Sequence, residues 1–364
     1  MNRKVAVNLA ERSYTVTIGA GVLDQLGPTA AEMGDVQSAA VVSDSNVAPL
    51  YGAQAVESLR GAGVGAELIT FPAGEEHKSL ATCGHLYDAL FAISPPIDRR
   101  TVVVALGGGV VGDVAGFVAA TALRGLRYIQ CPTTLLADVD SSVGGKTGVD
   151  HATGKNLIGA FHQPGAVLID VALLASLPDA ELANGLAECV KHGVIRDPAL
   201  LEFIEDRAEE ILQRRPDVMA ELVERNVAIK AAVVSADERE AGQREHLNFG
   251  HTIGHAVEVL VGYGKVLHGE AVSLGMVAAC AMAVARGLIE ADPARRVEAL
   301  LKRMGLPVRR EGLSADAIWD IMLHDKKARG GQVRMVLPVM LGQVATFEDI
   351  TPDTVGTALK ALRP

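Results

Sequence analysis

The sequence feature that most constrains the fold is a glycine-rich turn, A-L-G-G-G-V-V-G-D, at residues 105–113. It follows an apolar run from Thr101 that is typical of a buried strand, and it opens an amphipathic stretch. Gly107, Gly109 and Gly112 fit G-x-G-x-x-G, which brings a tight turn close to a pyrophosphate and points the free N–H groups of a helix at the anion. Unless the turn is purely structural, it predicts a dinucleotide loop between a strand and a helix.

The first half of the chain repeats this alternation of strand and helix. Strands are predicted from Val5, Tyr14, Ser38, Ala66, Thr101, Tyr128 and Ala166, the first two as an opening strand pair. Amphipathic stretches lie between several of them, at about residues 48–62, 79–93 and 110–123. This rhythm predicts an α/β domain with a mostly parallel, helix-covered sheet and a Rossmann-like dinucleotide site.

From Pro178 onward the pattern becomes helical. Helices are predicted at residues 179–195, 198–213, 217–235, 250–261, 270–287, 293–304 and 314–323, with one late strand from Val333. A chain of 364 residues exceeds what one hydrophobic core usually supports. We therefore expect an α/β domain with the dinucleotide site at residues 1–178 and an α-helical domain at residues 179–364.

Composition limits the classes of function. Hydrophobic residues make up 49% of the chain, enough for large cores, and the net charge of −10 argues against a nucleic-acid surface. The four cysteines form no C-x-x-C pair, which favours free thiols in a reducing compartment. No run reaches about 18 uninterrupted apolar residues. We expect a soluble, cytoplasmic protein that binds neither nucleic acid nor membrane.

The acidic ribose ligand of a dinucleotide site normally follows the glycines by about 20 residues. That region reads Y-I-Q-C-P-T-T here, and the acidic residue at a strand end is instead Asp44, well before the glycines. The sequence therefore predicts a dinucleotide site that differs from the commonest Rossmann arrangement.

A polar segment follows at residues 132–150, and G-K-N-L-I-G begins at Gly154. Its two threonines, Thr133 and Thr134, can offer hydroxyls to a nicotinamide or a phosphate. Although G-G-K-T resembles the end of a Walker A loop, Asp140 stands where the first glycine of that motif is needed, which argues against a nucleoside triphosphatase. Lysines beside such a loop favour a phosphate or carboxylate ligand.

Histidines gather in the helical half, where four of the ten lie between residues 246 and 268. His251 and His255 are four residues apart, which places them on one face of a helix with metal-ligand spacing. The alternative is a helix with two satisfied histidines, but His268, in L-H-G-E, and Asn248 favour a metal site. Zinc suits imidazole and carboxylate ligands. Glu188, in G-L-A-E-C-V-K-H-G, is a further candidate ligand. His192, four residues later, could be another, but a packed or surface histidine is favoured for it.

Basic residues scattered over the same half are a further candidate feature. Lys230 and Arg244 flank an acidic turn, and H-D-K-K from His324 adds Lys326 and Lys327. Each of them singly is expected to be a solvated charge. Together with the histidines they could line a cleft for a doubly anionic small-molecule substrate.

Over nearly its whole length the chain resembles the 3-dehydroquinate synthase family of sugar-phosphate cyclases. The first half carries G-E-E-H-K-S from Gly74, L-G-G-G-V-V-G-D from Leu106, P-T-T-L-L-A from Pro132, D-S-S-V-G-G-K-T-G from Asp140 and G-K-N-L-I-G-A-F from Gly154. The second half carries E-x-x-K-x-G from Glu188, L-N-F-G-H-T-I-G-H-A from Leu247, L-H-G-E-A-V from Leu267 and D-K-K from Asp325.

The resemblance implies NAD in the first domain, and zinc, or alternatively cobalt, beside the second. The implied metal ligands are Glu188, His251 and His268, which leaves His255 for substrate contact or proton transfer. The implied NAD residues are Asp44, Glu75, Lys78, Gly108, Gly109, Asp113, Thr133, Thr134, Asp140 and Lys146, the last two near the nicotinamide. The implied catalytic and substrate residues are Lys146, Lys155, Asn156, Lys191, Lys230, Arg244, Asn248, His255 and Lys326.

In this family the arginine matching Arg124 reaches the substrate phosphate from the neighbouring subunit, which implies a homodimer. Two points stay open. The choice of Lys326 over Lys327 is not fixed by the motif, and His77, inside G-E-E-H-K-S, has no assigned role.

The implied activity is that of a carbon–oxygen lyase of the shikimate pathway, on the route to chorismate and the aromatic amino acids. It converts 3-deoxy-D-arabino-heptulosonate 7-phosphate to 3-dehydroquinate and phosphate by transient oxidation with NAD, phosphate elimination, reduction, ring opening and intramolecular aldol closure. The alternatives are another sugar-phosphate cyclase, of valiolone or inosose type, and a metal-dependent polyol dehydrogenase of the glycerol dehydrogenase type. A non-enzymatic binding module gives no reason for three metal-type ligands beside a phosphate clamp.

Overall fold

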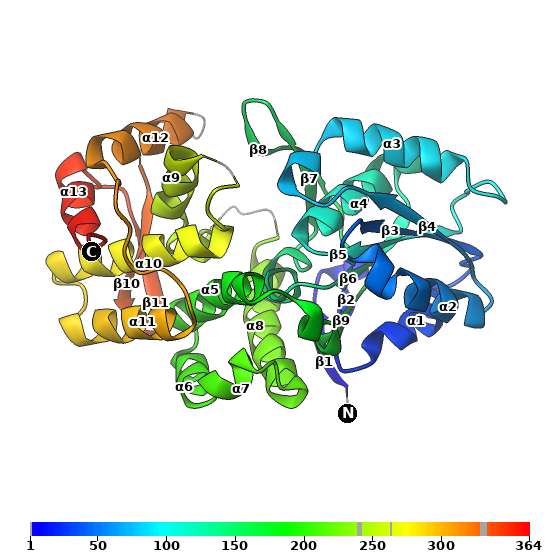
Figure 1. Cartoon of the computed structure of the whole chain (residues 1–364), viewed down its shortest axis with the longest axis horizontal. Coiled ribbons are helices and arrows are strands. Elements are labelled where there is room, and N and C mark those ends of the chain that lie inside the picture. The colour runs from blue at the N-terminus through cyan, green and yellow to red at the C-terminus, as the bar shows by residue number, and fades with distance from the viewer. Residues whose placement is uncertain (1, 239–241, 263, 328–332) are drawn as a thin grey trace. The chain divides into compact units, whose positions relative to one another are not determined.

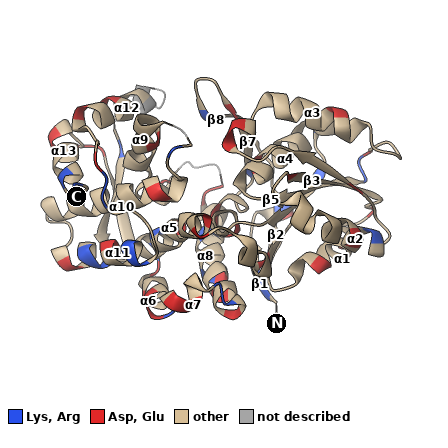
Figure 2. Ribbon diagram, viewed as in Figure 1, with Lys and Arg blue, Asp and Glu red and all other residues tan. Residues whose placement is uncertain are grey.

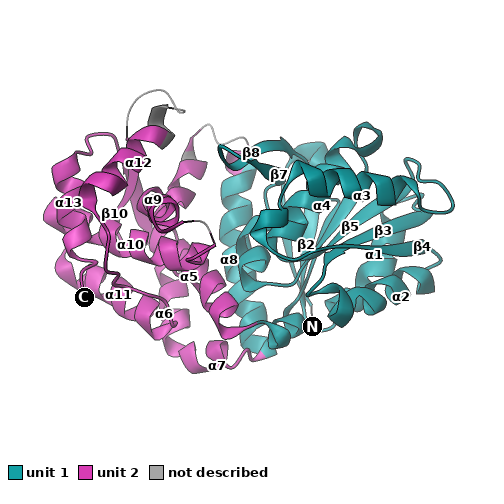
Figure 3. Cartoon of the chain, turned by 45° about the horizontal axis from the view of Figure 1, so that its top comes forward, with its two compact units in different colours: residues 1–177, 216–235 teal, residues 178–215, 236–364 magenta. Residues whose placement is uncertain are grey.

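The computed structural model describes the chain except for residues 1, 239–241, 263 and 328–332 and the side chains of residues 243 and 325–327. The chain divides into two compact units (Figure 3). Unit 1 comprises residues 1–177 and 216–235, and unit 2 comprises residues 178–215 and 236–364.

Unit 1 is built on a seven-stranded sheet with the order β1-β2-β9-β6-β5-β3-β4 (Figure 1). β1 pairs antiparallel with β2, and every other neighbouring pair is parallel. The strands are β1 (Arg3–Val7), β2 (Tyr14–Gly19), β3 (Ser38–Asp44), β4 (Gly65–Phe71), β5 (Thr101–Gly107), β6 (Arg127–Pro132) and β9 (Ala166–Asp170). The mostly parallel sheet and its strands are as the sequence predicts.

Helices cover both faces of this sheet, which is why central strands such as β5 are buried at every residue. One face packs against α1 (Leu26–Glu32) and α2 (Ala53–Gly61), where Leu26 and Leu59 meet Val104 in one core cluster. The other face packs against α3 (Leu80–Phe91) and α4 (Gly109–Thr121), where Leu86 and Val114 join a second cluster.

The polar segment after residue 132 folds differently from the loop that its composition predicts. It begins with the π-turn η6 (Ala137–Ser141) and continues into an antiparallel hairpin of β7 (Lys146–His151) and β8 (Gly154–Phe161). The hairpin escapes sequence analysis because its residues alternate little in hydrophobicity and β8 is largely exposed.

Helix α8 (Pro216–Ala236) accounts for the difference between the predicted domains and the two units. The predicted division after residue 178 lies one residue from the first division, at Leu177, but residues 216–235 group with unit 1. Polar contacts bind α8 to this unit: Arg3 pairs with Glu224, and the N–H of Asn8 donates to Ser235 Oγ over 3.0 Å. The hydrophobic periodicity of a segment predicts that it is a helix, but it does not predict the unit against which the helix packs.

Unit 2 is mainly helical, as predicted. Its helices are α5 (Asp179–Ile195), α6 (Pro198–Asp206), α7 (Ala208–Leu212), α9 (His251–Val261), α10 (His268–Ala285), α11 (Ala291–Arg303), α12 (Ala315–Lys327) and α13 (Pro352–Lys360). The helix predicted at residues 198–213 is divided at Arg207. The late strand predicted from Val333 corresponds to β10 (Met335–Met340), and its hairpin partner β11 (Gln343–Phe347) is not predicted. Figure 2 shows acidic and basic residues mixed along α11.

Helix α10 is the one described helix that is long and apolar enough to cross a membrane. Of its apolar window, 72% is buried inside the protein. The helix also begins at His268 and packs against α5 and α9 in unit 2. These features are those of a core helix. All four cysteines are buried free thiols, in agreement with the sequence analysis.

Candidate active site

The glycine loop lies at the carboxyl end of the parallel sheet, between β5 and α4. A Cβ added to Gly108 would lie 3.1 Å from Thr134 Cγ2, and one added to Gly109 would lie 3.3 Å from Ser141 Oγ. The loop also contacts the end of β6, because the N–H of Thr133 donates to Gly107 O over 3.0 Å. Small residues therefore keep the backbone accessible at the helix N-terminus, as a phosphate group requires.

Thr133 carries an unused polar atom at this place. Its side chain is buried, and Oγ1 has no hydrogen-bond partner among the described residues. Buried hydroxyls are normally paired, so an unpaired one next to the glycine loop fits a ligand group. Thr134 differs, because its Oγ1 accepts from the N–H of Ala137 over 3.2 Å and caps the turn that leads into η6.

Lys78 forms the centre of a buried polar cluster. It follows the short turn η4 (Glu75–His77), and its Nζ lies 2.6 Å from Asp113 Oδ2, on α4, and 2.5 Å from Asn156 Oδ1, on β8. Burial acts to lower the pKa of Lys78, but the charges of Asp113, Glu75 and Asp150 and the hydrogen bond to Asp113 together outweigh it and raise this pKa. Burial raises the pKa of Asp113, and Lys78 counteracts the rise. The two groups therefore form a lysine–carboxylate ion pair.

The β7–β8 hairpin joins this cluster. Lys155 Nζ lies 3.5 Å from Glu75 Oε1, and the N–H of Asn156, whose φ is 57°, donates to Asp150 Oδ1 over 2.7 Å. The N–H of Asp150 in turn donates to Lys78 O over 2.8 Å. Residues predicted to hold NAD (Glu75, Lys78) thus contact residues predicted to hold substrate (Lys155, Asn156).

A second pairing of this kind involves Asp140 on η6. The ammonium of Lys230, which comes from α8 and is buried, contacts both the Asp140 carboxylate and its backbone carbonyl. The unexpected membership of α8 in unit 1 is what brings Lys230, a predicted substrate residue, to Asp140, a predicted nicotinamide neighbour.

Three further predicted residues of unit 1 lie at the end of a strand, at the start of a strand and in a turn. Asp44 ends β3, where its Oδ1 accepts from the N–H groups of Asn46 (2.8 Å) and Val47 (3.0 Å) and so forms its own turn. Lys146 is exposed at the start of β7. Arg124 is exposed in the turn η5 (Ala122–Arg124), with a φ of 63°.

In unit 2 three elements bring together one carboxylate and two imidazoles. Glu188 is completely buried in α5, while His251 and His268 are the first residues of α9 and α10. Glu188 Oε1 lies 3.6 Å from His251 Nε2 and 3.7 Å from His268 Nε2, and one donor atom from each residue lies within 4.8 Å of the others. This His2Glu cluster is a set of donors that zinc accepts.

At His251 and Glu188, electrostatics favour the protonation states that a metal needs. Burial, followed by the charge of Lys191, lowers the pKa of His251 to about 3, which keeps this imidazole neutral. Burial would raise the pKa of Glu188, but Lys191 and the histidines outweigh it and hold this pKa well below its ordinary value. Lys191, predicted as a substrate residue, has its ammonium on Glu188 Oε2.

His268 has two carboxylate neighbours. Besides Glu188 near Nε2, Glu258 Oε2 lies 3.6 Å from its Nδ1. Burial acts to lower the pKa of His268, but the hydrogen bonds and charges of these two carboxylates raise it to about 9. Glu258 is the residue of this site that sequence analysis gave no role, although its position two helical turns after His251 was a usable signal.

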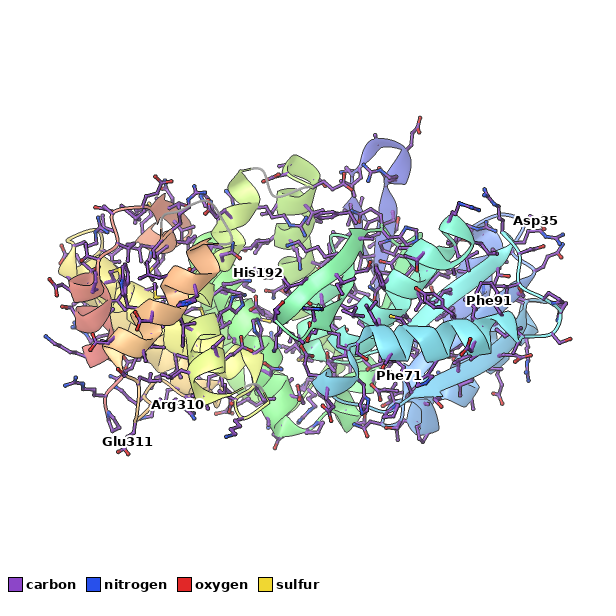
Figure 4. All side chains as sticks on the ribbon, turned by 90° about the horizontal axis from the view of Figure 1, so that it is seen from above. Asp35, Phe71, Phe91, His192, Arg310 and Glu311 are labelled. Atoms are coloured by element: carbon purple, nitrogen blue, oxygen red, sulfur yellow. The ribbon has the colours of Figure 1, made fainter. Side chains whose placement is uncertain are left out.

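His255, the partner of His251 in the spacing argument, is exposed, with its ring 5.4 Å from that of His251 and 5.9 Å from that of His268. It also belongs to a second possible metal group, with Glu258 and His268. Spacing along the helix nominates His251 and His255, whereas the cluster of His251 with Glu188 and His268 depends on how three helices pack. His192 is completely buried in α5 (Figure 4).

The remaining predicted residues of unit 2 lie on other elements. Arg244 is buried in the turn η8 (Gln243–Asn248), where its Nη1 donates to Glu238 O over 2.6 Å. Asn248 ends the same turn, three residues before His251. Lys326 belongs to α12, and its side chain lies outside the described part of the chain.

Solved structures with this fold are similar over almost the whole chain. A 2-epi-5-epi-valiolone synthase from Streptomyces hygroscopicus, with NAD+ and Zn2+ bound, has a TM-score of 0.88 and 30% identity and covers 98% of both chains. A 2-deoxy-scyllo-inosose synthase complexed with carbaglucose-6-phosphate, NAD+ and Co2+ has a TM-score of 0.87 and 29% identity and covers 99% of both. A glycerol dehydrogenase from Schizosaccharomyces pombe shares the fold alone, at 17% identity and a TM-score of 0.66. Fold and site residues thus define a sugar-phosphate cyclase.

Sequence comparison identifies the family more narrowly. Residues 68–184 match the N-terminal model, and residues 185–328 match the C-terminal model, of 3-dehydroquinate synthase. The 3-dehydroquinate synthase of Geobacter metallireducens is 50% identical over 333 residues, which cover 92% of both chains. That of Symbiobacterium thermophilum is 47% identical over 360 residues, or 98% of this chain and all of its own. The chain belongs to the 3-dehydroquinate synthase family.

Proposed function

We propose that the chain converts 3-deoxy-D-arabino-heptulosonate 7-phosphate to 3-dehydroquinate and phosphate. The observation that carries this proposal is the difference between two levels of similarity. Relatives named 3-dehydroquinate synthase are 47% and 50% identical over nearly the whole chain, whereas the cyclases that make valiolone-type and inosose-type rings are 30% and 29% identical. The overall reaction breaks a carbon–oxygen bond to phosphate and closes a carbocycle, so the enzyme is a lyase.

The metal ligands in this proposal are Glu188, His251 and His268, which would hold Zn2+ or Co2+. The His2Glu donor set, the neutral state of His251 and the anionic state of Glu188 support this assignment. When bound, the ion supplies Lewis-acid polarisation of a substrate hydroxyl. Lys191, on the second oxygen of Glu188, orients this carboxylate and adds positive charge for an anionic substrate.

The NAD site in this proposal is unit 1. The open glycine loop and the unpaired hydroxyl of Thr133 support it, together with Asp44 at a neighbouring strand end. NAD supplies a hydride acceptor that is regenerated within one turnover. The Lys78–Asp113 pair fixes α4 to β8 through Asn156, and Lys230 holds Asp140 in position.

The chain's own side chains then bind and orient the substrate. Lys155, Asn156, Arg244 and Asn248 supply cations and amides for a phosphate, a carboxylate and hydroxyls, which lowers the cost of developing negative charge. His255, which is exposed beside the metal cluster, would carry a proton to or from the substrate. Lys326 and Lys146 are assigned to the substrate from the family motif.

The remaining assignments concern organisation. We propose that unit 1 is the NAD-binding domain, that unit 2 is the metal- and substrate-binding domain, and that the enzyme is a cytoplasmic homodimer in which Arg124 reaches the neighbouring subunit's substrate phosphate. The exposure of Arg124, and of Leu157 (61%) and Phe161 (50%) on β8, supports a subunit contact through unit 1. The net charge of −10 supports the expectation that no nucleic acid is bound.

Phosphate release tests the proposal. Purified protein with NAD and Zn2+ should release phosphate from the heptulosonate phosphate without net accumulation of NADH, and a chelator should stop the release. Absence of phosphate release with the metal and NAD present would refute the proposed reaction. Net NADH formation with glycerol would instead indicate a polyol dehydrogenase, and phosphate release only from a different sugar phosphate would indicate another cyclase.

A further inference from the structure

Glu258 lies near the imidazole nitrogen of His268 that does not face Glu188. The two nitrogens of His268 face different carboxylates: Nε2 lies 3.7 Å from Glu188 Oε1, and Nδ1 lies 3.6 Å from Glu258 Oε2. An imidazole binds a metal through one nitrogen only, and the group on its other nitrogen sets the tautomer and the orientation of the ring.

The position of Glu258 follows from two helices. It lies seven residues after His251 on α9, so both point from the same side of that helix, while His268 is the first residue of α10. Only 5% of Glu258 is exposed. A carboxylate is costly to bury without a compensating charge, and the group beside Glu258 is the imidazole of His268, the first residue of α10.

We infer that Glu258 is a positioning residue for the metal: its carboxylate, 3.6 Å from Nδ1, attracts the Nδ1–H of His268 electrostatically, keeps Nε2 facing Glu188 and His251, and strengthens metal binding through this imidazole. The inference rests on the proposed function, because it takes His268 as a ligand. Glu258 adds a second carboxylate near a metal cluster in which Glu188 is the one acidic ligand and carries the Lys191 ammonium on its other oxygen.

The experiment measures metal affinity directly. The Kd for Zn2+ is determined by chelator competition for the wild type, Glu258→Gln, Glu258→Ala and His268→Ala, and Co2+ absorption spectra report the ligand geometry. Glu270→Gln is the matched control, because Glu270 lies in the first turn of α10 and its Oε2 accepts from the N–H of Leu267 (2.8 Å), a hydrogen bond that glutamine can also accept.

We expect Glu258→Gln and Glu258→Ala to weaken Zn2+ binding by about 10- to 100-fold and to alter the Co2+ spectrum, as loss of an outer-shell carboxylate does. His268→Ala should weaken it further, and Glu270→Gln should not change it. Thermal unfolding in chelator shows whether each variant is folded, and the isosteric glutamine keeps the test valid should the alanine variant fail to fold.

Two different failures can be told apart. Zinc affinity of Glu258→Gln within twofold of the wild type, together with loss of affinity in His268→Ala, would overturn the role of Glu258 and leave the metal ligands standing. Unchanged affinity in both variants would overturn the ligand assignment itself, and the inference with it.

Discussion

Asp138 gives the sharpest test of the electrostatics of unit 1. It lies on η6, two residues before Asp140, and is only 1% exposed. Neither of its carboxyl oxygens has a hydrogen-bond partner among the described residues. Burial, reinforced by the negative charge of Asp170, raises the pKa of Asp138 well above 3.8. We therefore expect this carboxyl group to be a neutral acid in the folded protein, since an unpaired buried carboxylate is far more costly.

The sign of the pH dependence follows from proton counting. Below pH 3.8 both the folded and the unfolded chain keep this proton, and above it the unfolded chain releases the proton while the folded chain retains it. The free energy of unfolding therefore falls as the pH rises from the ordinary pKa toward the folded pKa, by about 1.4 kcal/mol for each pH unit. Asp138→Asn keeps the shape and has no proton to lose, so this contribution disappears.

The assay is thermal unfolding of the wild type and Asp138→Asn at pH 5 and at neutral pH. We expect the melting temperature of the wild type to fall more between pH 5 and neutral pH than that of the variant. Each kcal/mol of unfolding free energy lost corresponds to about 2–4 °C in melting temperature for a unit of this size. Asp88→Asn, at an exposed position of α3, is the control and should follow the wild type. Equal pH dependence in Asp138→Asn and the wild type would show that Asp138 is charged, and would refute the reasoning.

Three further predictions concern the polar clusters. Lys78→Met leaves the mostly buried Asp113 carboxylate (19% exposed) without its cation and should cost about 3 kcal/mol of unfolding free energy by denaturant titration. Arg296→Met breaks a pair whose side chains are 35% and 28% exposed and should cost less than about 1 kcal/mol, so equal losses would contradict the argument from burial. His268→Ala should lose bound metal by elemental analysis, while His255→Ala should keep it, and the reverse result would restore the spacing-based pair. Chelator should lower the melting temperature of the wild type, because metal binds only the folded state, and should leave that of His268→Ala unchanged.

Local sequence patterns predict much of the fold. Val-rich runs such as β5 are apolar throughout because helices cover both of their faces, and the window at residues 179–195 became α5 with the predicted bounds. The hairpin β7–β8 and the helix division at Arg207 were missed. Their residues lack a clear hydrophobic period, so packing against neighbours decides their structure.

The candidate site divides in the same way. Spacing along one helix nominated His251 and His255, and family motifs nominated Glu188 and His268. That Glu188 lies between His251 and His268 depends on how α5, α9 and α10 pack, which the sequence periodicity of each helix does not specify.

The sequence by itself determined the order of strands and helices, the glycine loop, the family and the residue types available for chemistry, because these depend on local patterns and ordered motifs. The tertiary structure decided which charges meet: Lys230 with Asp140, Lys78 with Asp113 and Asn156, and Glu258 with His268. These partners are between 10 and 90 residues apart in the chain. Their pairing comes from the burial of apolar faces, which brings distant elements together and leaves each polar side chain to be satisfied by what packing places beside it.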